Sequence, residues 1–348
     1  GQYTSGDGND IYNIQEGASG NATIISGDGV DKFVVDSSES QVFINANVSG
    51  SGDNSSPINT SGVKTLSLIK GRVKHFFSGL ADDVITSSSG TWIGHYEGGG
   101  RSGFNTGAGN DLVEGKVSGE GIHLDTSRGI VDSYINTSTG DDQINGSVIN
   151  SVLHGGSGDD RIEMERAEGS IVDAGSGDDR IAIANESKSM QLFGGTGEDV
   201  IIGGNGNDMI SGGVGSDVLR GGAGADRFVF DVSSFGRGTD IVSDFNASEG
   251  DALELSAALT GINRGAEPIF ITASMAEGVN NDAAMIYDTL ENIQGQQATS
   301  IKMAYAHDIE SVMFDQDGDW TQGSDVLAVV RQTDGCTTDL DPSNIKIV

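Results

Sequence analysis

Residues 194–230 read "GGTGEDVIIGGNGNDMISGGVGSDVLRGGAGADRFVF" and repeat one nine-residue phrase four times, starting at Gly194, Gly203, Gly212 and Gly221. Each copy follows G-G-x-G-x-D-x-U-x, where U is a large apolar residue. Glycines at positions two and four allow φ > 0, so this half predicts a tight turn. The x-U-x half is typical of a very short strand with one side chain directed inward. Turn and strand renewed at a constant period predict a solenoid whose coils stack.

The aspartate at position six indicates what the turns bind. One carboxylate per turn, stacked on that of the next coil, would be strongly repulsive unless a cation lay between the two. Carboxylates and the carbonyls of a glycine-rich turn are oxygen-only ligands, which suit a hard ion. The pattern therefore favours Ca²⁺, with several ions along the chain.

This stretch resembles the RTX family, the calcium-binding nonapeptide repeats of bacterial secreted toxins, proteases and epimerases. The resemblance implies that two nine-residue units make one coil of a parallel β-roll. It also implies that calcium lies between turns on the same side of neighbouring coils. On that basis Asp199 pairs with Asp217, and Asp208 with Asp226. The candidate ligand set includes these turn residues: Gly194, Gly203, Gly212, Gly221, Thr196 and Asn205.

Upstream turns follow the same pattern less perfectly. Position one is the variable one and is often Ser or Thr, whereas position six is aspartate and position eight is apolar throughout. The aspartates, all candidate metal ligands, are Asp10, Asp31, Asp83, Asp111, Asp142, Asp160, Asp179, Asp199, Asp208, Asp217 and Asp226. From Thr137 the turns recur at steps of a full coil, with apolar pieces such as "SVLHGG", "SIVDAG" and "MQLFGG" as returning strands. We therefore expect one file of calcium sites from Asp142 to Asp217 and a second file that begins only at Asp208.

Composition agrees with a narrow solenoid. The 348-residue chain has a formal charge of −33, 54 glycines and 35% hydrophobic residues. We expect an all-β fold, a right-handed parallel β-solenoid with a C-terminal β-rich domain. The predicted parts are an irregular solenoid over 1–193, with insertions near 36–77 and 87–105; a regular β-roll over 194–230; a capping segment over 231–255; and a secretion-type domain over 256–348.

The end of the chain carries two further resemblances. "FVFDVSSFGRGTDIVSDFNASEGDALELSAA" is similar to the segment that closes the β-roll in serralysin-type proteases and alginate epimerase modules. There Asp240 and Asp244 are either ligands of the final site or surface aspartates flanking a strand. "MFDQDGDWTQGSDVLAVV" with the terminal "SNIKIV" resembles the C-terminal region of RTX proteins exported by type I systems. The acidic run at Asp315 lacks the twelfth-position glutamate of an EF-hand, so it indicates a polar turn.

Charge and calcium chemistry bear on location. Extracellular calcium sites have dissociation constants of about 10⁻⁴–10⁻³ M, far above cytosolic free calcium. We therefore expect the chain to stay unfolded inside a bacterium and to fold outside, at the cell surface or beyond. The single cysteine, Cys336, excludes an internal disulfide framework, and no apolar run is long enough to span a membrane. Nucleic acid is a poor partner for so acidic a chain. Because the chain starts at Gly1 almost inside a repeat, we expect a fragment of a longer protein.

Two classes of function remain open. The first is a calcium-stabilised scaffold, adhesin or surface-layer module, with cell-surface polysaccharide or self-assembly as partner and the C-terminus read by type I secretion machinery. The second is a carbohydrate-active module, a polysaccharide lyase, epimerase or binding module. It would use basic and aromatic residues of the insertions: Lys70, Arg72, His75, His95, Tyr96 and Arg101. Because neither H-E-x-x-H nor a nucleophile elbow occurs, we favour the non-enzymatic class.

Overall fold

The computed structural model divides into two compact units, residues 1–190 and 191–348. The described residues are 2–4, 8–15, 20–25, 31–45, 64–77, 84–87, 92–93, 102–105, 112–115, 129–131, 133–184, 187–231, 238–260, 264, 269–271, 284–294, 303–307, 309–315, 320–321, 324–332 and 340–348. Both units contain the predicted parallel β-solenoid, and helix is almost absent, so the predicted fold class is confirmed. No described helix has the length and apolar character that crossing a bilayer requires.

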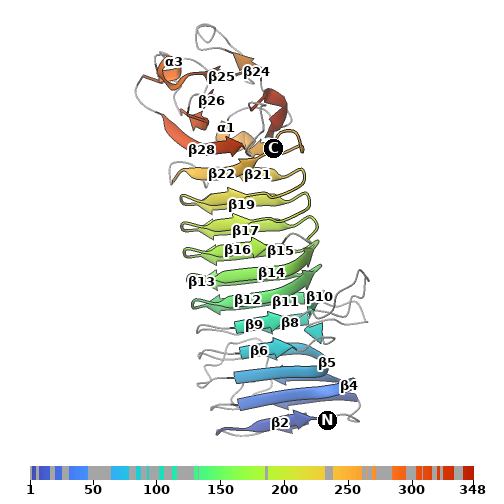
Figure 1. Ribbon diagram of the computed structural model, residues 1–348. Helices are drawn as coiled ribbons and strands as arrows, with labels where there is room; N and C mark the ends of the chain where they lie inside the picture. The colour runs from blue at the N-terminus through green and yellow to red at the C-terminus, as the bar shows by residue number, and fades with distance from the viewer. Residues whose placement is uncertain are drawn as a thin grey trace. The chain divides into compact units, whose positions relative to one another are not determined.

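In the first unit, strands stack as the coils of the solenoid (Figure 1). β13 (Val152–Ser157) pairs in parallel with β11 (Ser133–Thr139) and with β15 (Ile171–Ser176). On the other face, β14 (Arg161–Glu168) pairs in parallel with β12 (Gln143–Ile149). The remaining strands are β1 (Gln2–Thr4), β2 (Ile11–Ile14), β3 (Gly20–Ile25), β4 (Asp31–Asn45), β5 (Lys64–Phe77), β6 (Val84–Ser87), β7 (Trp92–Ile93), β8 (Ser102–Asn105), β9 (Leu112–Gly115), β10 (Gly129–Val131) and β16 (Arg180–Ile183).

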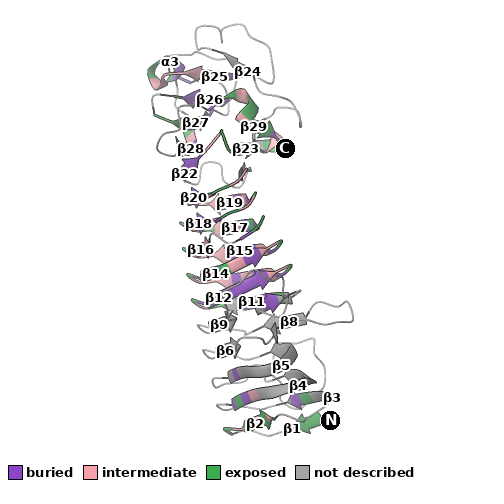
Figure 2. Ribbon diagram, turned by 45° about the vertical axis from the view of Figure 1, so that its right-hand side comes forward, coloured by how far each residue is buried: buried purple, intermediate pink, exposed green. Residues whose placement is uncertain are grey.

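The core is a ladder of single side chains, one from each strand. Ile144, Ile162 and Ile181 are register partners in β12, β14 and β16, and all three are buried. On the other face of the coils, Leu153 of β13 and Val172 of β15 are register partners and are fully buried. Figure 2 shows these strands carrying buried residues between more exposed ones. The alternation follows from the two-residue period of a strand, and each buried side chain of this size contributes about 1.5–3 kcal/mol.

The predicted insertions lie partly in solenoid strands. β4 runs from Asp31 to Asn45, and β5 pairs with it in parallel over Lys64–Phe77 with three register shifts. β7 and β8 pair in parallel with β5 and with later strands. The coil pattern therefore continues through much of the range near 36–77 and 87–105. The insertion prediction for 46–63 and 94–101 lies outside the described residues.

The second unit begins with the tandem repeats. β17 (Gln191–Thr196) pairs in parallel with β19 (Met209–Val214), and β18 (Val200–Ile202) with β20 (Val218–Arg220). The next coils add β21 (Arg227–Phe230), β22 (Asp240–Phe245) and β23 (Ala252–Leu255), again in parallel. "MQLFGG", like "SVLHGG" and "SIVDAG", forms a strand, as the sequence predicted for the returning side of each coil.

The segment predicted to cap the roll is itself covered by the chain's end. β28 (Asp325–Gln332) extends the sheet of β22 in parallel, and β29 (Ile345–Ile347) extends that of β23. β22 and β23 would otherwise present unpaired backbone, which these two strands satisfy. A small apolar core around Ile286 and Trp320 packs nearby strands. Other elements are α1 (Ala257–Thr260), β24 (Ile269–Ile271), β25 (Ala284–Asp288), α3 (Leu290–Gln294), β26 (Met303–Ala306), β27 (Ser311–Phe314) and η1 (Pro342–Asn344).

Candidate metal centre

The turns are closed by glycines in the left-handed region of backbone conformation. Gly213, at position two, has φ of +106°, and Gly215, at position four, has φ of +149°. A Cβ at either residue would also strike the carbonyl of the equivalent glycine one coil earlier, Gly195 or Gly197. Only glycine combines this φ with so close a stacking of turns. Tight stacking is what brings the position-six aspartates of neighbouring coils together.

The aspartates of successive coils are joined by a hydrogen bond from the backbone NH of one to the side-chain carboxylate of the next. In the first unit the NH of Asp142 donates to Oδ1 of Asp160 at 2.8 Å, and the NH of Asp160 donates to Oδ1 of Asp179 at 2.7 Å. In the second unit the NH of Asp199 donates to Oδ1 of Asp217 at 2.8 Å. The first predicted file of aspartates thus forms a hydrogen-bonded ladder from Asp142 to Asp179 in the first unit and from Asp199 to Asp217 in the second.

The second file occupies the opposite turns of the second unit. There the NH of Asp208 donates to Oδ1 of Asp226 at 2.9 Å, as the sequence pairing proposed. In the first unit the corresponding role falls to serine hydroxyls, because the NH of Ser151 donates to Oγ of Ser170 at 3.0 Å. The sequence pattern did not predict this serine ladder. One coil edge therefore carries carboxylates, and the opposite edge carries hydroxyls.

The other carboxylate oxygen faces a space that the turn encloses. Within the described part of the chain, the Oδ2 atoms of Asp160, Asp217 and Asp226 are buried and have no hydrogen-bond partner. A Cβ added at Gly203 would lie 2.6 Å from Oδ2 of Asp208 and 2.7 Å from the carbonyl oxygen of Gly221. Both distances are too short for a real Cβ, so glycine at position one lets a carboxylate oxygen and a carbonyl oxygen of the next coil approach the same point of the turn.

Burial makes these carboxylates costly to ionise in the absence of a cation. It raises the pKa of Asp160 to about 7 and that of Asp226 to about 6, with neighbouring carboxylates adding to the shift. Burial, followed by the charge of Asp217, raises the pKa of Asp240 to about 8. Burial also raises the pKa of Asp217. A buried row of like charges of this kind is stabilised by a positive charge between its members.

These donors fit a calcium ion. The oxygens are hard, and calcium takes six to eight of them. Among the described residues, no group of three or more His, Cys, Asp or Glu side chains is arranged to hold a metal ion. An ion between two coils would therefore need backbone carbonyls beside two aspartates, and the Gly221 carbonyl lies beside the same position-one glycine as Oδ2 of Asp208. Asp199 and Asp217, and Asp208 and Asp226, would hold such ions.

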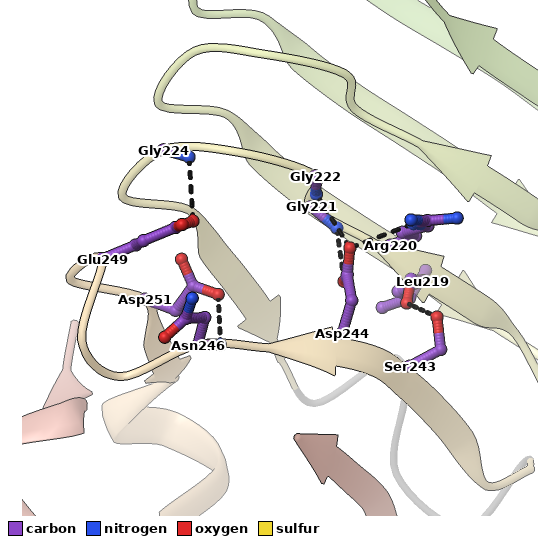
Figure 3. Close-up of polar contacts among 10 residues, drawn as sticks. All are labelled: Leu219, Arg220, Gly221, Gly222, Gly224, Ser243, Asp244, Asn246, Glu249 and Asp251. Atoms are coloured by element: carbon purple, nitrogen blue, oxygen red, sulfur yellow. Dashed lines mark hydrogen bonds and ion pairs between the residues drawn. The ribbon is translucent and has the colours of Figure 1, made fainter. Parts of the chain in front are cut away.

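The two aspartates beyond the tandem repeats have different positions. Asp240 continues the first file, because its Oδ1 accepts the NH of Asp217 at 3.0 Å. Asp244 instead accepts the NH groups of Gly221 at 2.9 Å and Gly222 at 3.0 Å, and Nε of Arg220 at 3.1 Å (Figure 3). These bonds engage both of its oxygens, so Asp244 clamps the last turn.

The structure adds one aspartate that the sequence reasoning missed. Oδ1 of Asp251 accepts the NH of Asp226 at 2.9 Å, which continues the second file. Its Oδ2 accepts the NH of Asn246 at 2.7 Å, and Glu249 reaches the NH of Gly224 (Figure 3). The signal was present, because Leu253 follows Asp251 at the same distance as position eight follows position six. The last turn is thus covered by carboxylates that bind its NH groups directly.

The remaining predicted residues divide as follows. Asp31 is buried and its Oδ1 accepts the NH of Asp10 at 3.0 Å, so the ladder also occurs near the start of the chain. Asp83 and Asp111 lie outside the described residues. The Thr196 and Asn205 side chains are exposed, unlike the buried aspartates. Asp315 is buried. For the carbohydrate-active hypothesis, Lys70, Arg72 and His75 lie in β5, whereas His95, Tyr96 and Arg101 lie outside the described residues.

Comparison with known proteins agrees with this geometry. A family model described as the RTX calcium-binding nonapeptide repeat matches the chain in four copies, over residues 136–163 and 192–228. No curated protein matches the chain. The predicted resemblance of the repeats is therefore confirmed. The serralysin-like and secretion-type resemblances of the C-terminal region lie outside the matched residues and stay predictions.

Proposed function

We propose that this chain, which carries RTX calcium-binding repeats, is a module of an exported bacterial protein that folds when calcium binds between its coils. The observation that carries this proposal is the buried, unpartnered Oδ2 of Asp217 and Asp226, each so close to the position-one glycine of its turn that a Cβ there would collide with it. Bound calcium supplies the positive charge and the coordination that these oxygens lack. In its absence the chain holds its formal charge of −33 without compensation.

Each recurring position of the nine-residue repeat has its own role in such a site. Position-six aspartates supply carboxylate oxygens, and their backbone hydrogen bonds fix each carboxylate against the neighbouring coil. Glycines at positions two and four let turns stack closely, and position-one glycines leave room for the ion. The core ladder contributes only a small buried apolar area per coil, since each coil has few large apolar residues. Ion binding and coil stacking are then one event, because the site is made by two coils.

The wider role follows from this coupling. Calcium sites of extracellular modules are weak enough to stay empty at cytosolic calcium, so the chain would pass through an exporter unfolded and fold outside. A type I secretion system reading the C-terminal region suits that route. A long solenoid stabilised in this way suits a scaffold, adhesin or surface-layer protein, with self-assembly or cell-surface polysaccharide as partner. The part of the chain that the structure describes shows no groove for the carbohydrate-active alternative, and the RTX repeats do not favour it.

The test is a calcium titration of chelator-treated protein followed by far-UV circular dichroism, with magnesium as the control ion. We expect a coil-to-β transition at about 10⁻⁴–10⁻³ M calcium, the range of extracellular modules. Magnesium should not reproduce it, because Mg²⁺ demands near-ideal octahedral geometry and gives up its bound water reluctantly. A full β signal in chelator that does not respond to calcium would contradict the proposal.

A further inference from the structure

The backbone conformation at position one of the repeat does not require glycine. The position-one residues Gly194 and Gly203 do not have the left-handed φ of the glycines at positions two and four. Any residue could therefore adopt their backbone conformation. What distinguishes them is space, since a Cβ at Gly194 would lie 2.7 Å from the carbonyl oxygen of Gly212 and closer still to the carboxylate of Asp199. Glycine is needed here because a Cβ would collide with two oxygens that the proposed function makes calcium ligands.

Thr137 stands at the same position of its turn and is fully buried. Its Oγ1 donates to the carbonyl oxygen of Gly155 at 2.7 Å and lies 3.3 Å from that of His154. Gly155 is position one of the following coil, just as Gly212 follows Gly194 and Gly221 follows Gly203. The hydroxyl of Thr137 thus binds the carbonyl that is equivalent to those lying close to Gly194 and Gly203 in the glycine turns.

We propose that Thr137 takes the place of a calcium ion between its coil and the next. The proposal rests on the proposed function, calcium binding between coils, and assigns which coil junction does without it. Its buried side chain stands at the position where glycine lets the two oxygens approach, and its hydroxyl engages the carbonyl that would otherwise be a ligand. A neutral hydrogen bond therefore joins these two coils. Among the described turns of the first unit, the turn of Gly155, where Oδ2 of Asp160 and the Ala174 carbonyl lie close to the glycine, is then the first to bind an ion.

This assignment makes position one the residue that selects the kind of junction. Glycine gives a calcium-bridged pair of coils, and threonine gives a hydroxyl-bridged pair with the same backbone ladder. Four upstream turns also carry a hydroxyl at this position, at Ser5, Ser26, Ser78 and Thr106. These residues lie outside the described part of the chain, and the proposal concerns Thr137 alone.

The experiment counts calcium ions per chain by native mass spectrometry at saturating calcium, on the full 348-residue chain. Thr137→Gly should open the space and add one ion to the wild-type count. Thr137→Val is the matched control, since it keeps the space filled but removes the hydroxyl, and its count should equal that of the wild type. Gly203→Thr is the reciprocal change and should remove one ion, that of Asp208 and Asp226.

The outcomes separate the two levels of the proposal. A wild-type chain that binds no calcium would overturn the proposed function. If the wild type binds calcium and Thr137→Gly leaves the count unchanged, the inference fails while the function stands. A lower count in Thr137→Val would show that the hydroxyl is itself a calcium ligand and would also overturn the inference. Should Thr137→Gly fold poorly, an unchanged count in Gly203→Thr would refute it independently.

Discussion

The coils of residues 133–184 and the tandem coils of residues 191–230 each have the same kind of parallel hydrogen-bond ladder. They differ in the side chains of their turns. In the earlier coils, carboxylates line one edge, and serines such as Ser170 line the other. In the tandem coils, both edges carry aspartates, with glycine at every position one. The parallel hydrogen-bond ladder is compatible with either chemistry. On the proposed function, dependence on calcium would therefore be set by one or two side chains per turn and not by the fold.

The largest expected effect of this difference is on local stability when calcium is removed. We expect amide exchange to rise in both regions on chelation, and about tenfold more in 200–228 than in 143–176, since the tandem coils lose ions at both edges. Hydrogen–deuterium exchange with peptide resolution measures this directly. Equal increases in the two regions would mean that the serine edge contributes no calcium-independent stability.

The core ladder should not distinguish the two regions. Ile201 and Ile162 are both fully buried at the same position of their repeats. We expect Ile201→Ala and Ile162→Ala each to lower the free energy of unfolding by about 2–5 kcal/mol in saturating calcium, because each opens a cavity in a one-residue-wide core. Urea denaturation followed by circular dichroism measures both. A much smaller cost for Ile162→Ala would show that the earlier coils depend less on apolar packing.

The site chemistry can be separated from the backbone ladder with a matched pair of aspartates. Asp217 and Asp159 each accept a backbone NH of a neighbouring coil through Oδ1, at 2.8 Å and 2.9 Å. Asp217 is buried and Asp159 is exposed. Asp217→Asn should lose one calcium ion and shift the folding midpoint to higher calcium, whereas Asp159→Asn should do neither. Calcium stoichiometry by equilibrium dialysis decides, and an unchanged count in Asp217→Asn would contradict the proposed pairing with Asp199.

The smallest effect concerns pH and is felt only by calcium-free protein that is still folded. The folded pKa values of Asp226, Asp160 and Asp240, about 6, 7 and 8, lie above the ordinary 3.8. Because the fold disfavours the ionised form, its calcium-free stability is greatest near pH 4 and is lost as pH rises through about 6–8. Circular dichroism of metal-depleted protein should therefore show more β structure at pH 5 than at pH 8. The opposite trend would contradict the burial of these carboxylates.

The repeat was predictable from the sequence because its chemistry is local. A tight turn needs glycine within the phrase, and an inward side chain needs a fixed spacing, so both recur at a constant period. The resemblance of the repeats to the RTX family implied the pairing of Asp208 with Asp226, and the structure joins the two by a hydrogen bond. Asp251 obeys the same spacing but follows a less regular segment, which is why the periodic pattern did not include it.

The sequence by itself determined the solenoid, its inward ladder and the aspartates that line its turns. Only the tertiary structure decided which oxygens meet across coils. Asp240 continues a file while Asp244, four residues later, clamps the NH groups of Gly221 and Gly222. Thr137 and Gly203 occupy one position of the repeat, yet the Thr137 hydroxyl binds a carbonyl of the next coil, whereas Gly203 lets such a carbonyl and a carboxylate lie close together. The physical reason is that a site between coils is built from residues about 18 positions apart, and local periodicity does not specify how their side chains share the space between them.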